Sequence, residues 1–437
     1  KQYYKDMENY ELFIEHLKNH FDSKIVDDLI NSLDKEPTGS LLLNTKKINI
    51  ETLKKYYSTL RKHPFIDNVY YYDKQIDAPG KSFLFDNGAY YIMDSSSLLI
   101  HYFLDIKDGF NILDLCAAPG GKTISISLKN SNCNIISNDI SMPRILSMRE
   151  NLERLGIVNV TLSCINPAKL NLKYQNTFDV IILDAPCSGS SMFRKNEFSK
   201  LDWTKEKVNK CVNTQKELIR IAFNLLKPGG IISYSTCSFS YEENEGVILD
   251  FINNEPRAKV INLPHIEGEY RHKDLKEAIH LFPNLYNGEG QFICQIKKDE
   301  SLINSSLPKN KKISINKQQS LELKDFKYQE IKNNHLFLFN NYLDLSNFNI
   351  IKNGLDAYEI KKSLLIPTFH LAHYLDNKNS IKLNDSDFKK YIHGDLIKTN
   401  LNLPDGFYVV SYENINLGYV KKVGNDLKNY YPKGLRH

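Results

Sequence analysis

The chain has 437 residues, of which 41% are hydrophobic and 25% are charged, a composition typical of a globular protein. The length allows three or four domains, and no apolar run reaches the roughly 18 residues that a membrane-spanning helix needs. The net charge of +5 is compatible with a nucleic-acid partner but does not require one.

The first part of the chain predicts a small α+β unit. Apolar positions at helical spacing over Tyr10–Leu33 predict two short helices that pack as a cap on a larger body. Ser40–Asn44 and Val69–Tyr72 have the composition of strands, and a Lys-rich helix is expected between them over Glu51–Arg61. The tyrosines of the second strand could stack on RNA bases, although packing is the commoner role of tyrosines in a strand.

A strand, a glycine-rich turn and a helix follow one another over Asn111–Thr123, whose sequence is NILDLCAAPGGKT. Before this stretch, Asp94 or Ser95 is a good N-cap for a helix that leads into the sheet. The residues up to Leu115 predict a buried strand, and the glycines allow a ligand to approach the backbone closely. In α/β proteins this arrangement binds nucleotide-like cofactors, although the turn alone could be an ordinary connection.

The alternation of strands and helices continues, and a polar residue follows each of the next two strands. Asn134–Ser137 is a predicted strand ahead of Asp139, which could accept hydrogen bonds from ribose hydroxyls or cap the helix expected over Pro143–Leu155. A third strand over Val158–Cys164 ends just before Asn166. The Asn166 side chain could meet an adenine edge or form a turn.

Two further strands each lead into a cysteine. Phe178–Gly189, with the sequence FDVIILDAPCSG, predicts a strand and a sharp turn that carries Asp184 and Cys187. Ile231–Thr236 predicts another strand, and Cys237 follows it. Because the carboxyl ends of parallel strands share one edge of a sheet, both cysteines should lie where a cofactor binds. The remaining elements expected in this domain are a helix over Thr204–Leu226 and a strand over Gly290–Ile296.

The C-terminal part predicts β structure beyond a linker. Lys297–Lys312 is rich in Ser, Asn, Pro and Lys and is typical of a linker. Leu336–Leu343 and Leu345–Ile351 predict a small strand-rich unit, and Phe407–Ser411 with Leu417–Lys421 predicts a hairpin. The chain ends in mixed basic and aromatic residues, which could bind RNA or form a solvated tail.

The seven cysteines include no C-x-x-C pair, which argues against a zinc site, and their odd number argues against a disulfide framework. We therefore expect no metal and a reducing, cytoplasmic setting, in which a special cysteine serves chemistry. Carbon 5 of cytosine is a poor nucleophile, and a thiolate that adds to carbon 6 activates it for methylation by S-adenosylmethionine. A carboxyl group such as that of Asp184 would stabilise the protonated base.

A cytosine methyltransferase that works through a cysteine needs only one attacking thiol. The residues alone do not choose between Cys187 and Cys237, and burial as small hydrophobic side chains is the alternative for both. The target cytosine would have to be unpaired or flipped out to meet a thiol.

Three motifs, LDLCAAPGGKT, DAPCSG and STCS in this order, resemble those of the Sun family of RNA cytosine-C5 methyltransferases. The layout is most similar to the RsmF type, which modifies small-subunit ribosomal RNA, and the resemblance covers nearly the whole chain. It implies a Rossmann-like class I methyltransferase sheet with a small α+β N-terminal unit and a C-terminal β-rich, PUA-like RNA-binding region. The expected organisation is an RNA-binding unit at 1–86, an S-adenosylmethionine-dependent methyltransferase domain at 87–298, a linker at 299–312, a small middle domain at 313–375 and a PUA-like domain at 376–437.

By this resemblance Cys237 is the attacking thiol, Cys187 helps to release the product, and Asp184 reaches both the cofactor and the target base. The positions that match those binding S-adenosylmethionine are Cys116, Ala117, Ala118, Pro119, Gly120, Gly121, Lys122, Asp139, Asn166 and Asp184. The implied partner is RNA, specifically ribosomal RNA or a small ribosomal subunit, and the protein is expected to be a monomer that binds no membrane.

The chain departs from the family pattern in places. Asn166 stands where Asp is common, which removes a charge but still permits a hydrogen bond to adenine. Leu42, Met93 and the stretch His280–Asn284 also differ, and these positions bear on the placement of RNA more than on chemistry.

Other functions stay open on the sequence. Transfer RNA is the closest alternative substrate, and a ribosome-assembly factor with an idle cofactor pocket is an alternative without catalysis. A DNA cytosine methyltransferase is disfavoured because no Glu-Asn-Val motif follows the cysteine after proline.

Overall fold

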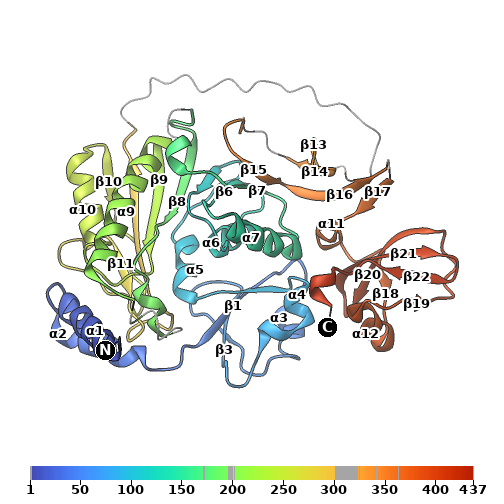
Figure 1. Cartoon of the computed structure of the whole chain (residues 1–437), viewed down its shortest axis with the longest axis horizontal. Coiled ribbons are helices and arrows are strands. Elements are labelled where there is room, and N and C mark those ends of the chain that lie inside the picture. Colours follow the sequence, from blue (N-terminus) through green and yellow to red (C-terminus); the bar gives the residue numbers. More distant parts are fainter. Residues whose placement is uncertain are drawn as a thin grey trace.

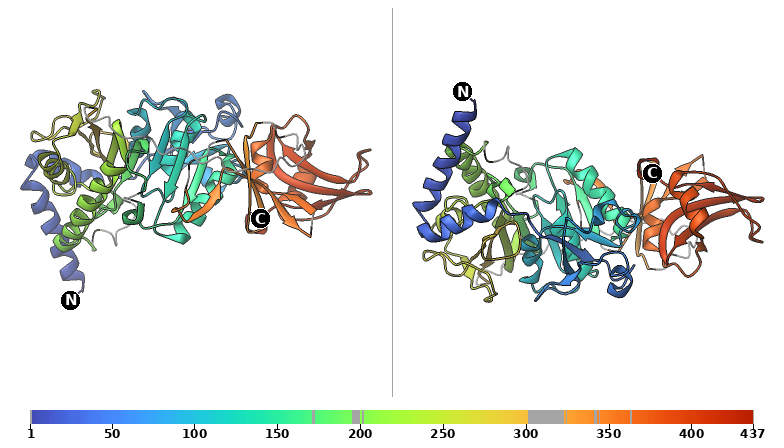
Figure 2. Two further views of the ribbon diagram at one scale, coloured as in Figure 1. Left: turned by 90° about the horizontal axis from the view of Figure 1, so that it is seen from above. Right: turned by 90° about the horizontal axis from the view of Figure 1, so that it is seen from below.

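The computed structural model describes residues 2–170, 173–194, 200, 202–300, 323, 325–340, 343, 345–362 and 364–436. An α/β domain occupies the centre of the molecule, with two N-terminal helices at one end and a β-rich C-terminal domain at the other (Figure 1, Figure 2). The predicted linker 299–312 lies, after its first two residues, outside the described residues. Within these described ranges, no helix is long and apolar enough to cross a membrane.

The central sheet has nine strands within the described residues, in the order β10-β12-β9-β8-β5-β6-β7-β15, with β11 paired to β12 beside this path. Strands β5 to β9 run parallel, and antiparallel strands extend the sheet at both ends. The bounds are β5 Asn111–Asp114, β6 Asn134–Asn138, β7 Val160–Ser163, β8 Phe178–Asp184, β9 Leu226–Thr236, β10 Ala258–Ile261, β11 Ile279–Leu281, β12 Gln291–Lys298 and β15 Ile350–Asn353.

Helices cover both faces of this sheet, because successive residues of a buried strand point to opposite sides. In β5, Ile112 packs in the hydrophobic cluster that α5, α6 and α7 complete, whereas Leu113 packs in the cluster with α9 and α10. The predicted Rossmann-like fold is confirmed. The bounds are α5 Ser95–Tyr102, α6 Gly121–Lys129, α7 Met142–Leu155, α9 Lys205–Leu225 and α10 Glu245–Asn254.

The two N-terminal helices, α1 (Gln2–Lys18) and α2 (Ser23–Leu33), pack on the central domain next to the loops that follow β8 and β9. The ring of Phe13 meets those of Phe193 and Trp203 edge-on at centroid distances of 5.0 and 5.3 Å. These helices therefore form the predicted cap, and it lies over the cysteine side of the sheet.

A four-stranded sheet in the order β2-β3-β1-β4 follows these helices. The strand bounds are β1 Gly39–Leu43, β2 Arg61–Lys62, β3 Val69–Tyr72 and β4 Tyr90–Ile92. Tyr70, Tyr71 and Tyr72 are at most 9% exposed. They are packed in the interior, so the commoner role of tyrosines in a strand is confirmed over stacking on RNA bases.

The helix predicted over Glu51–Arg61 is much shorter than expected. Helix α3 spans only Ile50–Leu53. The Asp77 carboxylate accepts hydrogen bonds from the backbone N–H groups of Ser58 and Thr59 at 3.3 and 3.0 Å, and these contacts hold the segment in a turn. The other short helices before the central domain are η1 Pro79–Lys81 and α4 Phe83–Asp86.

The C-terminal part contains two more sheets, in the orders β13-β14-β16-β17 and β18-β20-β21-β22-β19. The predicted hairpin is present as β20 and β21. The bounds are β13 Tyr328–Lys332, β14 His335–Phe339, β16 Leu355–Lys361, β17 Leu364–Pro367, α11 Phe369–Tyr374, β18 Ile381–Lys382, α12 Asp385–His393, β19 Ile397–Lys398, β20 Gly406–Tyr412, β21 Ile415–Val423, β22 Asp426–Asn429 and η4 Lys433–Leu435.

The strand predicted over Leu345–Ile351 takes a different place. Strand β15 begins at Ile350 and pairs with β7, so it extends the central sheet and does not belong to a separate unit. Phe348, just before it, is buried in the central core against the ring of Tyr174. This apolar anchor explains why the segment joins the larger domain.

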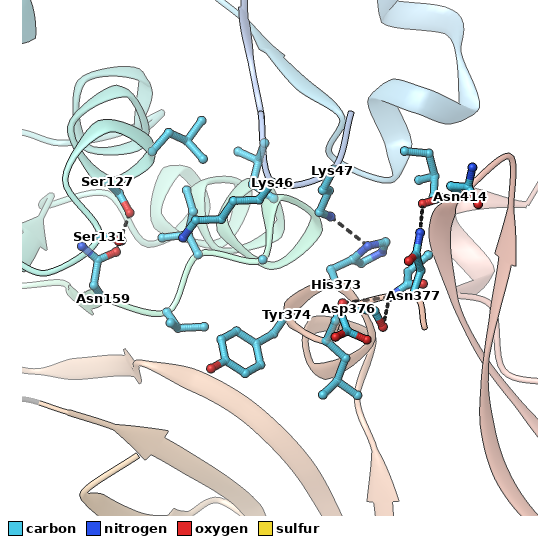
Figure 3. A pocket seen from close by; sticks show the side chains of 18 residues that line it. Lys46, Lys47, Ser127, Ser131, Asn159, His373, Tyr374, Asp376, Asn377 and Asn414 are labelled. Atoms are coloured by element: carbon cyan, nitrogen blue, oxygen red, sulfur yellow. Dashed lines mark hydrogen bonds between the residues drawn. The ribbon is translucent and has the colours of Figure 1, made fainter. Parts of the chain in front are cut away.

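A pocket of about 310 Å³ lies where the N-terminal unit, the central domain and the C-terminal part meet. Figure 3 shows Lys47 pointing toward His373 of α11 in this pocket. The Lys47 ammonium donates to His373 Nδ1 at 3.0 Å and to the carbonyl oxygens of Asn87 and Arg154 at 2.8 and 2.5 Å. One half-buried side chain thus connects three parts of the chain, and we call this set of contacts the Lys47 junction.

Candidate active site

The predicted site residues follow parallel strands, whose carboxyl ends share one edge of the sheet. The glycine turn follows β5, and Asp139 and Asn166 follow β6 and β7. Asp184 is the last residue of β8, and Cys237 comes directly after β9. The sheet order therefore brings the pieces of one site together from distant parts of the chain.

The glycine turn is held by the backbone around it. The N–H of Ala117 donates to the carbonyl oxygen of Asn138 at 2.7 Å, which ties the turn to the end of β6. Gly120 has a φ of +105°, and a Cβ atom there would come within 2.7 Å of the Met148 side chain. Only glycine fits that position, and helix α6 begins at the next residue.

Two of the predicted cofactor-binding residues already have local partners. Asp139 is buried and accepts a hydrogen bond from the backbone N–H of Ala118 at 3.2 Å, which joins it to the glycine turn. Asn166 is exposed, and its Oδ1 accepts from the N–H of Ala168 at 3.0 Å, the turn role considered above. The parts of these two residues in cofactor binding stay predictions.

A half-buried ion pair lies beside the glycine turn. The Lys122 ammonium donates to Asp184 Oδ2 at 2.7 Å, and Ser235 donates to Asp184 Oδ1 at 2.8 Å. Gln291 completes the shell by donating to the same oxygen at 3.3 Å. Burial acts to lower the pKa of Lys122. The charge of Asp184 and the hydrogen bond to it outweigh that effect and raise the pKa, so the ammonium stays charged.

The two cysteines lie in contact at the same edge. Both are half-buried, and their sulfur atoms are 3.1 Å apart. The hydrogen bond from Cys187 lowers the pKa of Cys237, with help from the positive charge of Lys122, despite burial and the charge of Asp184. The hydrogen bond and burial raise the pKa of Cys187. The pair therefore favours a thiolate at Cys237 and a thiol at Cys187, a choice that the residues alone left open.

A third cysteine, Cys116, lies at this edge, and its surroundings favour the thiol over the thiolate. Burial, followed by the charges of Asp114 and its acidic neighbours, raises the pKa of Cys116 well above its ordinary value. No cluster of three His, Cys, Asp or Glu side chains that could hold a metal ion is found in the described part of the chain.

The structure adds polar residues that the sequence reasoning missed. Asp114 ends β5 with a 1% exposed side chain, and burial raises its pKa to about 7. Thr123 donates to its Oδ2 at 2.7 Å, while its Oδ1 is buried and has no hydrogen-bond partner among the residues that the structure describes. Ser235 also lies at a strand end, so the position of a polar residue at the end of an apolar strand is the signal that could have found both.

A parallel sheet with a glycine turn after its first strand, and with the polar side chains of the site along its carboxyl edge, defines the class of Rossmann-like methyltransferases. Residues 101–297 match the family model described as 16S rRNA methyltransferase RsmB/F. Residues 11–95 match the N-terminal domain of 16S rRNA methyltransferase RsmF, and residues 378–437 match the methyltransferase RsmF PUA domain. The chain therefore belongs to the RsmB/F methyltransferase family and has the domain arrangement of RsmF.

The similarity extends over the full length of curated relatives. The chain is 29% identical to ribosomal RNA small subunit methyltransferase F of Shewanella piezotolerans, over 97% of this chain and 96% of that protein. It is 27% identical to the protein of the same name from Vibrio parahaemolyticus, over 94% of each chain. Among solved structures, a methyltransferase homolog protein from Pyrococcus horikoshii superposes with a TM-score of 0.57 and 28% identity, covering 66% of this chain and 94% of that one.

Proposed function

We propose that this protein transfers a methyl group from S-adenosylmethionine to carbon 5 of a cytosine in 16S ribosomal RNA, through a covalent bond between Cys237 and carbon 6. The observation that carries the proposal is the thiol pair, 3.1 Å apart, beside the Lys122–Asp184 ion pair. Addition to a pyrimidine ring requires a thiolate from a cysteine of lowered pKa. A neighbouring protonated thiol and a charged acid–base pair assist the later steps.

The cofactor would be held by the backbone of residues 116–122, with Asp139, Asn166 and Asp184 around it. The cradle fits such a ligand, because Gly120 leaves the turn free of side-chain bulk and the buried Asp114 Oδ1 lacks a partner. When bound, S-adenosylmethionine supplies the methyl group that carbon 5 accepts.

The residues of the chain do the rest of the chemistry. Cys237 adds to carbon 6, and its lowered pKa favours the thiolate that this addition needs. Asp184, charged beside Lys122, lies where it can stabilise the protonated ring nitrogen of the base. After methylation a base takes the carbon 5 proton, and the electron pair of that bond restores the double bond between carbon 5 and carbon 6 as the carbon–sulfur bond breaks. The protonated Cys187 assists the release of the Cys237 sulfur.

The substrate part of the proposal rests on the domain arrangement and on the relatives. The N-terminal and PUA domain models flank the methyltransferase domain, and the curated relatives are named for the small-subunit ribosomal RNA. The site would accept a cytosine that is unpaired or flipped out of its helix. A cytoplasmic location and a monomeric state belong to the same proposal.

Methyl transfer with radiolabelled S-adenosylmethionine tests the proposal on 16S ribosomal RNA, small subunits and transfer RNA. We expect Cys237→Ala to lose activity on the order of 10³-fold or more, because no thiol remains to attack. Cys187→Ala should instead trap a covalent RNA adduct that survives a denaturing gel. Cys133→Ala is the matched control, because Cys133 is buried just before β6, away from the carboxyl edge.

Two results would contradict the proposal. Full methyl transfer by Cys237→Ala would exclude its sulfur as the nucleophile, and label on transfer RNA alone would replace the substrate. Bisulfite sequencing of the labelled RNA identifies the modified base.

A further inference from the structure

A buried acid that the mechanism above does not use lies directly behind the two cysteines. Glu243 follows β9 and precedes α10, and its side chain is 0% exposed. No salt bridge to Glu243 is found among the residues that the structure describes. A carboxyl group without a cation is costly to bury, so its hydrogen bonds must stabilise it.

The Glu243 side chain joins the two cysteine loops. Its Oε1 accepts from the hydroxyl of Ser238, the residue after Cys237, at 2.6 Å, and also from the hydroxyl of Ser188. Its Oε2 accepts from the backbone N–H of Ser188, the residue after Cys187, at 2.9 Å. Four donors in total meet this carboxylate, because the amide of Gln215 also donates to Oε2 at 3.0 Å.

Among the described residues, Glu243 and its partner Gln215 make more hydrogen bonds to the Cys187 loop than to the Cys237 loop. The Gln215 amide also donates to the carbonyl oxygen of Pro186 at 2.9 Å, so the residues on both sides of Cys187 are tied to the Glu243 network. Among the described residues of the Cys237 loop, Ser238 is the one whose side chain meets Glu243, and the loop is also fixed by the Ser191 N–H, which donates to the Cys237 carbonyl oxygen at 3.0 Å. The network therefore fixes the spacing of the two sulfur atoms.

The charges around the two sulfur atoms also favour a thiol at Cys187 and a thiolate at Cys237. After the hydrogen bond and burial, the negative charges of Glu243 and Asp184 raise the pKa of Cys187. For Cys237 the corresponding charges are Asp184, which raises the pKa, and Lys122, which lowers it. Cys211 of α9 and Tyr234 of β9 are the other titratable groups that face this network, and burial raises the pKa of both.

We propose that Glu243 is a positioning residue that holds the Cys187 and Cys237 loops in register and whose negative charge selects Cys237 as the thiolate of the pair. This inference deepens the proposed function, because it states why one of two adjacent thiols attacks. Glu243 acts through the cysteines and touches no substrate.

Alkylation by iodoacetamide, in the absence of RNA and S-adenosylmethionine, tests the inference on the full chain. Peptide mass spectrometry gives the initial rate of modification at each cysteine. In the wild type Cys237 should react before Cys187. In Glu243→Gln the ratio of the two rates should fall by about tenfold, the change that one pKa unit produces.

Glu243→Gln removes the charge but can keep the contacts. Its amide nitrogen can donate to the hydroxyls of Ser188 and Ser238, while its oxygen accepts from the Ser188 N–H and the Gln215 amide. Glu242→Gln is the matched control, because that neighbouring carboxylate lies 2.9 Å from His16 of α1 and faces away from the thiols. This variant should leave the ratio unchanged.

An unchanged ratio in a folded Glu243→Gln variant would overturn the inference. If that variant does not fold, the alkylation rates of the wild type still test the inference. Faster modification of Cys187 than of Cys237 between pH 7 and 8 would also overturn the inference. A wild type that shows the expected ratio but methylates no RNA would instead contradict the proposed function and leave the assignment of the thiolate intact.

Discussion

Lys122 at the candidate active site and Lys47 at the Lys47 junction are both half-buried, but their partners differ. Lys122 pairs with a carboxylate at 2.7 Å, and the charge of that partner raises its pKa against the effect of burial. Lys47 meets two carbonyl oxygens and a histidine nitrogen, and burial followed by the charge of Arg154 lowers its pKa well below the ordinary value. A counter-charge keeps one ammonium charged, whereas neutral acceptors only satisfy hydrogen bonds.

This difference between the two lysines indicates that Lys122 serves the chemistry of the site, whereas Lys47 serves the stability of the fold. At the active site a fixed charge acts on a neighbouring thiol, and the buried Asp114 Oδ1 has no partner. At the Lys47 junction the amino group has its partners within the protein, namely two carbonyl oxygens and a histidine nitrogen. Substitutions at the two places should therefore affect different measurements, activity at the first and stability at the second.

The largest effect is expected from Asp184→Asn. The amide keeps the shape of the carboxyl group and can accept from Ser235, but it gives no charge to Lys122 or to the base. We expect methyl transfer in single-turnover assays to fall by about 10²–10⁴-fold, the range for loss of an acid–base group. Ser235→Ala is the control that removes the hydrogen bond and keeps the charge. Activity of Asp184→Asn within about threefold of the wild type would exclude Asp184 from the chemistry.

Asp114→Asn should change the pH dependence of stability at the active site. Asp114 has a pKa of about 7 in the folded chain, raised from 3.8 mainly by burial. Between these values the folded state keeps a proton that the unfolded state has lost, so the wild type loses stability as the pH rises. The Asn side chain mimics the protonated acid, and its advantage should grow by up to about 1.4 kcal/mol per pH unit in this window.

Urea unfolding of Asp114→Asn and wild type from pH 4 to 8 measures this effect. Curves that stay parallel over the whole range would mean that Asp114 is already charged near pH 4. In that case Asp114 would not be a strained buried acid, and the active site would differ from the Lys47 junction only in the charge of Lys122.

The sequence predicted the candidate site far better than the contacts around it. Strand periodicity and the glycine turn are local patterns, and parallel pairing then brings Asp184, Cys187 and Cys237 to one edge. Partnerships across the chain leave no such pattern, since Lys47 and His373 are 326 residues apart. Glu243 sits in a run of polar residues after β9 that resembles a solvated turn, and only the fold buries it.

The errors in the predicted elements have the same cause. The segment after Leu53 has the composition of a helix, but a carboxylate from outside the segment, that of Asp77, holds it in a turn. Strand β15 has a β-rich sequence that fits either sheet, and the partner that it pairs with is set by the burial of Phe348. Local propensity is overridden where a distant residue supplies the contact.

Lys47→Met should give the smallest effect, because two contributions oppose each other. Two carbonyl oxygens and His373 Nδ1 lose their donor, which costs stability, while the variant no longer buries an ammonium. We expect a net loss of about 1 kcal/mol in the free energy of unfolding near pH 7 and unchanged methyl transfer per folded molecule. Lys46→Met, which alters an exposed lysine of the same pocket, is the control.

The pH dependence of Lys47→Met identifies the state of the lysine. The pKa of Lys47 is lowered from 10.5, so below that value the unfolded chain binds a proton that the folded chain releases earlier. The wild type should therefore gain stability as the pH rises toward 10, and the variant should lack that gain. A wild type and variant that stay parallel up to pH 10 would show a fully charged Lys47, held like Lys122, and the contrast between the two lysines would be lost.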